Sequence, residues 1–263
     1  MKIGFLGCGN MGGALARAVR RAMPDAAILA VDADPSRRAA LTADIGAIPS
    51  DAEGMLAESD FVFLGLKPQV LPGVMAGLSA AVLASHATFI SMAAGVTLDA
   101  LSDMLGGRPV IRIMPNTAVE VGAGVIVFTP SPAVSEEAKG AFLSMMSASG
   151  YCDEIPESMM DAACSVSGCG PAFAYLFLEA LADGGVSCGL PRDRALRYAA
   201  ATVAGAMQMV AETGRHPAAL KDAVCSPGGS TIAGVRALEE GGLRAATIGA
   251  VSAAYRRTKE LGK

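Results

Sequence analysis

The sequence predicts an α/β fold: a doubly wound, mostly parallel sheet in residues 1–155, followed by an all-helical domain in residues 156–263. Three observations lead to this prediction. Short apolar runs alternate with amphipathic stretches up to about residue 155, which is typical of βα units. Beyond that point the strand-like runs stop and Ala-rich helical segments follow. A glycine-rich turn comes directly after the first apolar run, where such sheets bind their ligands.

Six apolar runs show little alternation, so they are expected to be strands buried on both faces. They are residues 2–7, 27–33, 61–67, 88–94, 109–115 and 124–130. Several of the stretches between them carry helix start signals. Pro35 opens residues 35–45, Thr97 precedes a helical pattern, and Ser135 is followed by two acids. This alternation predicts a sheet with helices packed against it.

Composition argues against several classes of protein. Of the 263 residues 52% are hydrophobic and 17% charged, and the net charge of −4 disfavours a nucleic-acid partner. The most apolar stretch, residues 171–186, contains Glu179 and Asp183, so a buried helix is predicted there and no membrane span. The first residues lack a secretion signal, which predicts a cytoplasmic protein. Neither a metal site nor a catalytic histidine is predicted. The six cysteines are scattered, and the two histidines are expected on the surface or in loops.

The motif GCGNMG, from Gly7 to Gly12, lies between the first predicted strand and the first predicted helix. Gly7 permits the tight turn, Gly9 lets the backbone approach a pyrophosphate, and Gly12 allows close helix–strand packing. The N–H groups at the helix start would bind the phosphates. The motif therefore predicts a Rossmann dinucleotide site. Its predicted cofactor-binding residues are Leu6, Gly7, Cys8, Gly9, Asn10, Met11 and Gly12.

An acid at the end of the second predicted strand, Asp32, lies where a carboxylate receives the adenosine ribose, and Asp34 is assigned to the same site. Asp32 would repel a 2′-phosphate and so favours NADH. Arg37 and Arg38 follow closely; they either bind that phosphate, which keeps NADPH open, or are solvated on a helix face. If Asp32 selects NADH, Asp32→Ala shifts the preference toward NADPH.

Loops at the carboxyl ends of the later strands are expected to contact the cofactor as well. The predicted contacts are Leu66, Lys67, Pro68, Ala93, Ala94 and Asn116. Lys67 faces either a phosphate or ribose, or solvent. The amide of Asn116 suits either a nicotinamide edge or a fixed turn.

The helical half contains segments that are apolar on more than one face, such as residues 195–211. A helix that is apolar all round must be buried, which predicts packing against other subunits; a tight monomeric bundle is the alternative.

The segment CSPGGST, residues 225–231, separates two helical stretches. Taken alone, it is best explained as an interhelical turn with Ser230 as the N-cap, although a helix start there also offers free N–H groups to an anion.

Several motifs, in the correct order along essentially the whole chain, together resemble the pyrroline-5-carboxylate reductase family. They are GCGNMG, LKP, AAGVTLDAL, RIMPNT, SVSGCGPAFAYLFLEAL and LKDAVCSPGGSTIAGVRALEEGGLRAA. The resemblance implies an oxidoreductase that reduces 1-pyrroline-5-carboxylate to L-proline with NAD(P)H, the last step of proline biosynthesis. It also implies a helical domain that dimerises by interleaving helices, with assembly of five dimers into a decamer in some members.

The same resemblance implies the site residues of the helical half. Gly228, Gly229, Ser230 and Thr231 would bind the substrate carboxylate and ring, and Thr231 would be the catalytic residue that orients the ring and polarises its C=N bond. It places Glu157 near the substrate as well, although an acid at a helix start is common in any case.

The chain departs from the family pattern at three positions. Cys169 and Phe173 stand in SGCGPAF where the family usually has SGSGPAY, and Ser230 stands where threonine is more frequent.

Two other functions remain open. One is a dehydrogenase of 3-hydroxy acids, which would need a catalytic lysine such as Lys221. The other is a non-catalytic NAD(P) sensor, which has no reason to keep SPGGST.

Overall fold

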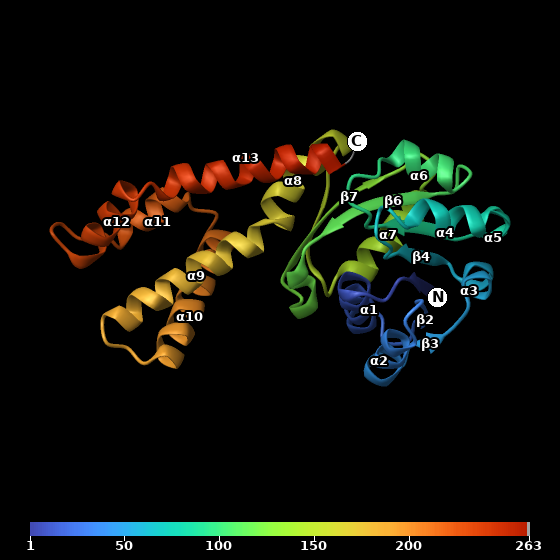
Figure 1. Ribbon diagram of the computed structural model, residues 1–263, viewed down its shortest axis with the longest axis horizontal. Coiled ribbons are helices and arrows are strands. Elements are labelled where there is room, and N and C mark those ends of the chain that lie inside the picture. The colour runs from blue at the N-terminus through green and yellow to red at the C-terminus, as the bar shows by residue number, and fades with distance from the viewer. Residues whose placement is uncertain (262–263) are drawn as a thin grey trace. The chain divides into compact units, whose positions relative to one another are not determined.

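The computed structural model describes residues 1–261, which divide into two compact units. One unit contains residues 1–169 together with the chain from 254 onward, and the other contains residues 170–253 (Figure 1). The sheet unit thus extends past the boundary predicted at 155/156. The extension consists of a 3₁₀ turn η2 (Glu157–Met159), helix α8 (Met160–Ala163) and a π-helical turn η3 (Cys164–Gly168). It belongs to the sheet unit because Met160 is fully buried against Met114 and Val127.

Among the described residues, one sheet holds eight strands in the order β3-β2-β1-β4-β5-β6-β7-β8. They are β1 (Lys2–Leu6), β2 (Ala27–Val31), β3 (Ile48–Pro49), β4 (Phe61–Leu64), β5 (Thr88–Ser91), β6 (Val110–Pro115), β7 (Gly124–Pro130) and β8 (Gly150–Glu154). Every neighbouring pair is parallel except β6 and β7, which are antiparallel. The doubly wound, mostly parallel sheet is confirmed, and all six predicted strands are present.

Helices cover both faces of the sheet. They are α1 (Asn10–Ala22), α2 (Pro35–Ile45), α3 (Ala52–Glu58), α4 (Leu71–Gly77), α5 (Ser79–Ala84), α6 (Leu98–Met104) and α7 (Glu136–Met146). The predicted caps are confirmed, since Thr97 Oγ1 accepts the Ala100 N–H and Ser135 Oγ accepts the Ala138 N–H. Helix α7 ends before residue 150, because the residues from Gly150 form β8.

Successive side chains of each strand point to opposite faces of the sheet, so the apolar interior of the sheet unit consists of two layers, one on each face. Phe5 and Phe63 stack at 4.5 Å between ring centroids in the layer beneath α1, α2 and α7. Leu6 and Leu64 point to the opposite face, beneath α3, α4, α5 and α6. Each fully buried side chain of this size contributes roughly 1.5–3 kcal/mol. The two-sided burial explains why the strands are continuous apolar runs, and it fixes the strand ends from which the site is built.

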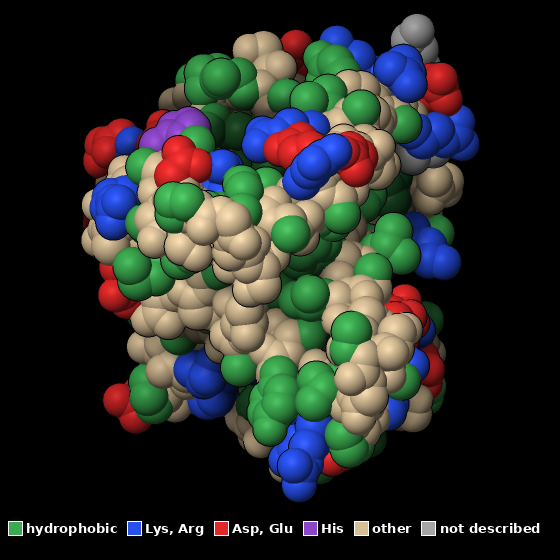
Figure 2. Space-filling model, turned by 90° about the vertical axis from the view of Figure 1, so that its left-hand side faces the viewer, with side chains coloured by type: hydrophobic (Ala, Val, Ile, Leu, Met, Phe, Trp, Pro, Cys, Tyr) green, Lys and Arg blue, Asp and Glu red, His purple; other side chains and the backbone are tan. Residues whose placement is uncertain are grey.

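The second unit is helical and contains α9 (Gly170–Ser187), α10 (Arg192–Thr213), α11 (Pro217–Ala223), α12 (Ser230–Glu240) and the first part of α13 (Leu243–Leu261). Its interior is small: the buried side chains between α9 and α10 are Ala182, Ala195 and Ala199. Large apolar side chains stay exposed in this unit, and Figure 2 shows apolar side chains on the surface among charged ones. They include Tyr175, Leu176, Tyr198, Met207 and Ile248.

The helical stretch Glu157–Ser187 is long and apolar enough to cross a membrane by length and composition, and only 6% of its most apolar window is buried within this chain. The same stretch carries Glu179 and Asp183, and Asp183 is paired with Arg192 of α10. The apolar surface of α9 is thus exposed within a single chain.

Candidate dinucleotide and substrate sites

The glycine turn after β1 is shaped by close backbone contacts. Gly7 has φ of +101°, a conformation that favours glycine, and a Cβ on it would lie 2.6 Å from the carbonyl oxygen of Gly65. A Cβ on Gly12 would lie 2.1 Å from the carbonyl oxygen of Gly7. A Cβ on Gly9, however, would have Nη1 of Arg37 as its nearest neighbour, at 3.6 Å. Two glycines are thus required by packing, whereas Gly9 leaves space beside the backbone for a ligand.

Helix α1 begins directly at this turn without a side-chain cap. Gly9 is the N-cap residue, and the first intrahelical hydrogen bond runs from the Gly13 N–H to the Gly9 carbonyl at 2.7 Å. The N–H groups of Asn10, Met11 and Gly12 therefore have no partner within the helix. Unpaired N–H groups at the positive end of a helix are suited to a phosphate. The turn fits the pyrophosphate of a dinucleotide.

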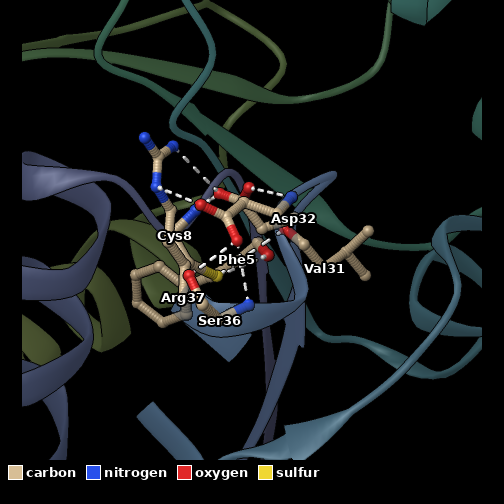
Figure 3. Close-up of polar contacts among 7 residues, drawn as sticks. Phe5, Cys8, Val31, Asp32, Ser36 and Arg37 are labelled. Atoms are coloured by element: carbon tan, nitrogen blue, oxygen red, sulfur yellow. Dashed lines mark hydrogen bonds and ion pairs between the residues drawn. The ribbon is translucent and has the colours of Figure 1, made fainter. Parts of the chain in front are cut away.

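Asp32 plays a different role from the one its position in the sequence suggests. Its Oδ2 accepts the Cys8 N–H at 2.7 Å and its Oδ1 accepts the Asp34 N–H at 2.8 Å (Figure 3). Only 7% of its side chain is exposed. The carboxylate holds the glycine turn against the end of β2, so its main contacts are with the backbone that shapes the site.

The exposed acid at this strand end is Asp34. Its side chain is 48% exposed and its Oδ1 accepts hydrogen bonds from the N–H and the hydroxyl of Ser36, at 2.9 and 2.6 Å. Both bonds lower the pKa of Asp34, so it is ionised at neutral pH. Arg37 lies 3.7 Å from a carboxylate oxygen of each acid and is itself half-exposed. Of the two acids, Asp34 presents the more accessible carboxylate to a ribose.

An open hollow of about 660 Å³ lies beyond these acids, at the carboxyl ends of β2 and β3. It is lined by Val31, Pro35, Arg38, Ala39, Pro49, Ser50 and Asp51. Arg38 faces this hollow, whereas Arg37 lies between the two acids. The two arginines are therefore not equivalent as partners of a 2′-phosphate.

The Cys8 thiol points into the protein. The side chain is 6% exposed, and its sulfur lies 3.6 Å from the carbonyl oxygen of Val31. Burial, and then the charge of Asp32, raise the pKa of the thiol to about 11. The Cys8 side chain is thus an inert apolar group, and its backbone N–H is already bonded to Asp32.

The other predicted cofactor loops lie at the same edge of the sheet as the glycine turn. Leu6, Leu64 and Ser91, where β1, β4 and β5 end, are in register across the parallel strands. The residues that follow β4 include Leu66, Lys67 and Pro68, of which Lys67 is exposed; those that follow β5 include the buried Ala93 and the exposed Ala94. The structure therefore brings these loops to one edge, as predicted.

Asn116, predicted to face nicotinamide or fix a turn, fixes a turn at the end of β6. Its Oδ1 accepts the N–H groups of Ala118 and Val125, and its Nδ2 donates to the carbonyl of Ser167 at 3.0 Å. Only 8% of the residue is exposed. These bonds support the turn and leave one amide hydrogen for any other contact.

Glu157 forms an ion pair with the buried Arg112 that sequence reasoning did not predict. Its Oε1 accepts from Nη1 of Arg112 at 2.5 Å and from the N–H of Leu98 at 2.7 Å. Arg112 is 4% exposed, and its Nε is buried without a hydrogen-bond partner. The pair borders a hollow of about 540 Å³ that Thr97, Asp161, Thr258 and Lys259 also line, with two further residues. Glu157 thus anchors the chain after β8 to β6 and to the start of α6.

The SPGGST segment forms a tight turn followed by an uncapped helix. The Gly229 N–H donates to the Ser226 carbonyl at 3.1 Å, and Gly228 has φ of +70°. Pro227 followed by a glycine of positive φ matches a type II turn. Ser230 is the first residue of α12 and Gly229 is the cap, with no side-chain hydrogen bond, so the alternative with Ser230 as the N-cap is wrong. The N–H groups of Ser230 and Thr231 therefore have no partner within the helix.

Comparison with known proteins identifies the family. The family model described as pyrroline-5-carboxylate reductase dimerisation matches residues 157–261, and the one described as NADP oxidoreductase coenzyme F420-dependent matches residues 2–95. The pyrroline-5-carboxylate reductase of Escherichia coli is 40% identical over 100% of this chain and 98% of its own length. That of Arabidopsis thaliana is 41% identical over 100% of this chain and 96% of its own. The chain belongs to the pyrroline-5-carboxylate reductase family.

Solved structures of this family have the same architecture. The pyrroline-5-carboxylate reductase of Coxiella burnetii aligns with a TM-score of 0.91 at 30% identity, over 99% of this chain and 98% of that one. The pyrroline carboxylate reductase of Plasmodium falciparum, with NADP bound, aligns at 0.87 and 28% identity over 100% and 98%. Prephenate dehydrogenase of Aquifex aeolicus, at 18% identity over 80% of this chain and 90% of that one and a TM-score of 0.53, shares the fold alone. Membership of the reductase family favours an imine reductase over a 3-hydroxy acid dehydrogenase or an NAD(P) sensor.

Proposed function

We propose that this chain is a pyrroline-5-carboxylate reductase, which reduces the C=N bond of 1-pyrroline-5-carboxylate to give L-proline. The observation that carries the proposal is the uncapped start of α12 beside Thr231, in a chain that matches reductases over its full length. The substrate is a small ring with one carboxylate and one imine, and SPGGST offers a donor group for each. The cofactor NAD(P)H, when bound, supplies the hydride.

The substrate carboxylate binds at the N–H groups of Ser230 and Thr231, where the helix dipole favours a negative charge. Gly228 and Gly229 let the ring approach the backbone because they carry no side chain. The Thr231 side chain is exposed at this helix start, and its hydroxyl donates to the ring nitrogen. A threonine hydroxyl is too weak an acid to protonate an imine outright. Thr231 therefore orients the ring and polarises the C=N bond, while water supplies the proton.

The cofactor pyrophosphate binds at the start of α1, and the adenosine ribose binds at Asp34. The Asp34 carboxylate disfavours a 2′-phosphate, which supports NADH. Arg37, at 3.7 Å from both acids, offsets part of that charge, and Arg38 faces the neighbouring hollow. Both cofactors are therefore accepted, with NADH preferred.

A second copy of the chain covers the exposed apolar side chains of the helical unit. The family model that spans residues 157–261 is one of dimerisation, and the small core around Ala182 cannot bury these helices by itself. The dimer is the unit of a larger assembly, up to a decamer, in the cytoplasm, with neither a membrane nor a nucleic acid as partner. Light scattering after size exclusion measures the assembly directly, and a monomeric protein would contradict this part of the proposal.

The test of the function is oxidation of NADH and NADPH in the presence of 1-pyrroline-5-carboxylate, with a 3-hydroxy acid and a substrate-free sample as controls. Thr231→Ala should lower turnover at least tenfold and leave NADH binding intact, since a single preorganised donor is worth on the order of 10²-fold. Thr231→Ser keeps the hydroxyl and is the matched control. Near-normal turnover of Thr231→Ala would remove Thr231 from the mechanism, and a wild type without activity on the imine would refute the function.

A further inference from the structure

Two cysteines lie at the ends of the π-helical turn η3, just before the chain leaves the sheet unit. The Cys169 N–H donates to the Cys164 carbonyl at 3.0 Å, which is the i+5 to i bond of a π turn. In a regular α-helix, side chains meet at spacings of three and four, so residues five apart face different sides. The wider π turn instead places Cys169 above Cys164.

The Cys164 side chain is directed toward the end of the turn that carries Cys169. The Cys164 sulfur leans over Gly168, since it lies 3.1 Å from where a Cβ on that glycine would be. Both residues are half-buried, and neither is in a disulfide. Burial is the largest cause that raises the pKa of the Cys164 thiol, with Cys169 and Asp161 adding to it and the charge of Arg112 opposing it.

We propose that Cys164 and Cys169 form a dithiol site that is converted to an intramolecular disulfide by a small-molecule disulfide. The Cys169 thiolate attacks one sulfur of the reagent, which forms a mixed disulfide and releases one thiolate. Cys164 then loses its proton to water and attacks the Cys169 sulfur, which releases the second thiolate. The two cysteines lose two protons and two electrons, and the reagent is reduced to two thiols. Burial raises the pKa of the Cys164 thiol, so little of it is thiolate at neutral pH, and it attacks once the mixed disulfide has formed beside it.

A disulfide between Cys164 and Cys169 would close the turn η3, which lies where the chain passes from the sheet unit to the helical unit. The carbonyl of Ser167, inside the bridged loop, accepts the Asn116 amide at the end of β6. Cys169 is the last residue of the sheet unit before α9. A bond across the turn would therefore fix the segment from which the helical unit starts. This inference does not depend on the proposed reductase activity.

The experiment treats the folded, full-length protein with excess oxidised glutathione, followed by acid quenching and alkylation of the remaining thiols. Cleavage after Glu157 and Glu179 yields residues 158–179, which contain Cys164 and Cys169 and no other cysteine. In the wild type we expect this peptide to lose both alkylation sites and two hydrogen atoms, and a dithiol reductant to restore both sites. Cys225→Ser, which removes a cysteine of the other unit, should behave identically.

Cys164→Ser separates the two steps. Without the second thiol, the peptide should carry glutathione on Cys169 and form no bridge. A wild-type peptide that keeps both alkyl groups after oxidation, or that carries a lasting glutathione on Cys169, would overturn the proposal. The wild-type measurement decides the question by itself if the variant does not fold.

Discussion

Replacement of Asp32 by alanine tests whether this carboxylate binds the cofactor or holds the glycine turn. In the structure its two oxygens accept the N–H groups of Cys8 and Asp34, at 2.7 and 2.8 Å. Alanine leaves both donors without these acceptors, at a side chain that is only 7% exposed. We therefore expect Asp32→Ala to act first on folding and only secondarily on the choice between NADH and NADPH.

The magnitude follows from the two bonds. A hydrogen bond to a charged group contributes about 1.5–3 kcal/mol, and water can reach part of the space that alanine leaves, so we expect a loss of about 3 kcal/mol in the free energy of unfolding. For a domain of this size that corresponds to a fall of about 6–12 °C in the unfolding midpoint. Thermal unfolding monitored by fluorescence measures the fall, and the Michaelis constants for NADH and NADPH are determined on the same samples.

Asp34→Ala is the matched control at the neighbouring acid. It removes the N-cap of α2, which costs about 1 kcal/mol, and so lowers the midpoint by only about 2–4 °C. Because Asp34 is the exposed acid, this variant should shift the preference toward NADPH. An Asp32→Ala protein with an unchanged midpoint and a clear shift toward NADPH would refute this reasoning and restore Asp32 as the ribose ligand.

Three further predictions concern the sheet unit. Gly12→Ala should destabilise the protein by about 3 kcal/mol or abolish soluble expression, because its Cβ would lie 2.1 Å from a carbonyl oxygen; Gly13→Ala, where the nearest atom is 3.4 Å away, should fold. Glu157→Gln should cost about 1.5–3 kcal/mol, because it removes the charge of the nearer of two acids beside the buried Arg112; Asp161 lies at 4.0 Å. The unfolding midpoint should fall and the Michaelis constant for the imine should stay unchanged; a raised Michaelis constant at an unchanged midpoint would indicate substrate binding instead. Cys8, with a pKa of about 11, should resist alkylation at pH 8 in the folded protein and react after unfolding; labelling in the native state would show that it is accessible.

Sequence patterns predicted the strands that are buried on both faces, because two-sided burial leaves a continuous apolar run in each. They did not predict β3, which has two residues, or β8, whose sequence GYCDE contains two acids. Both lie at the edges of the sheet, where neighbouring strands and helices decide the pairing and local composition carries little signal. The short helices α3, α4 and α5, of six or seven residues each, were not predicted either.

The site residues show a similar limit. An acid at the end of β2 can face a ribose or the neighbouring glycine turn, and both arrangements satisfy the same sequence pattern; only the orientation of the Asp32 side chain decides between them. The Arg112–Glu157 pair joins residues 45 positions apart, so no local pattern describes it. A signal was nevertheless present, because an arginine in an apolar run is buried with the strand and needs an acid beside it.

The caps of the helices connect the fold with the chemistry. The N-cap residues of helices α2, α3, α6 and α7 are Asp34, Asp51, Thr97 and Ser135, and each of these side chains accepts an N–H of the first turn. Helices α4, α5 and α10 have no side-chain cap, and neither do α1 and α12; the last two have glycine at the N-cap, Gly9 and Gly229, so no cap side chain covers the N–H donors of their first turns. Glycine at the cap costs only a few tenths of a kcal/mol relative to a polar residue, so stability hardly opposes it. A polar cap would compete with an anion for the same donors. The two glycines therefore keep donors available in the segments where a pyrophosphate and a carboxylate are expected, one in each unit.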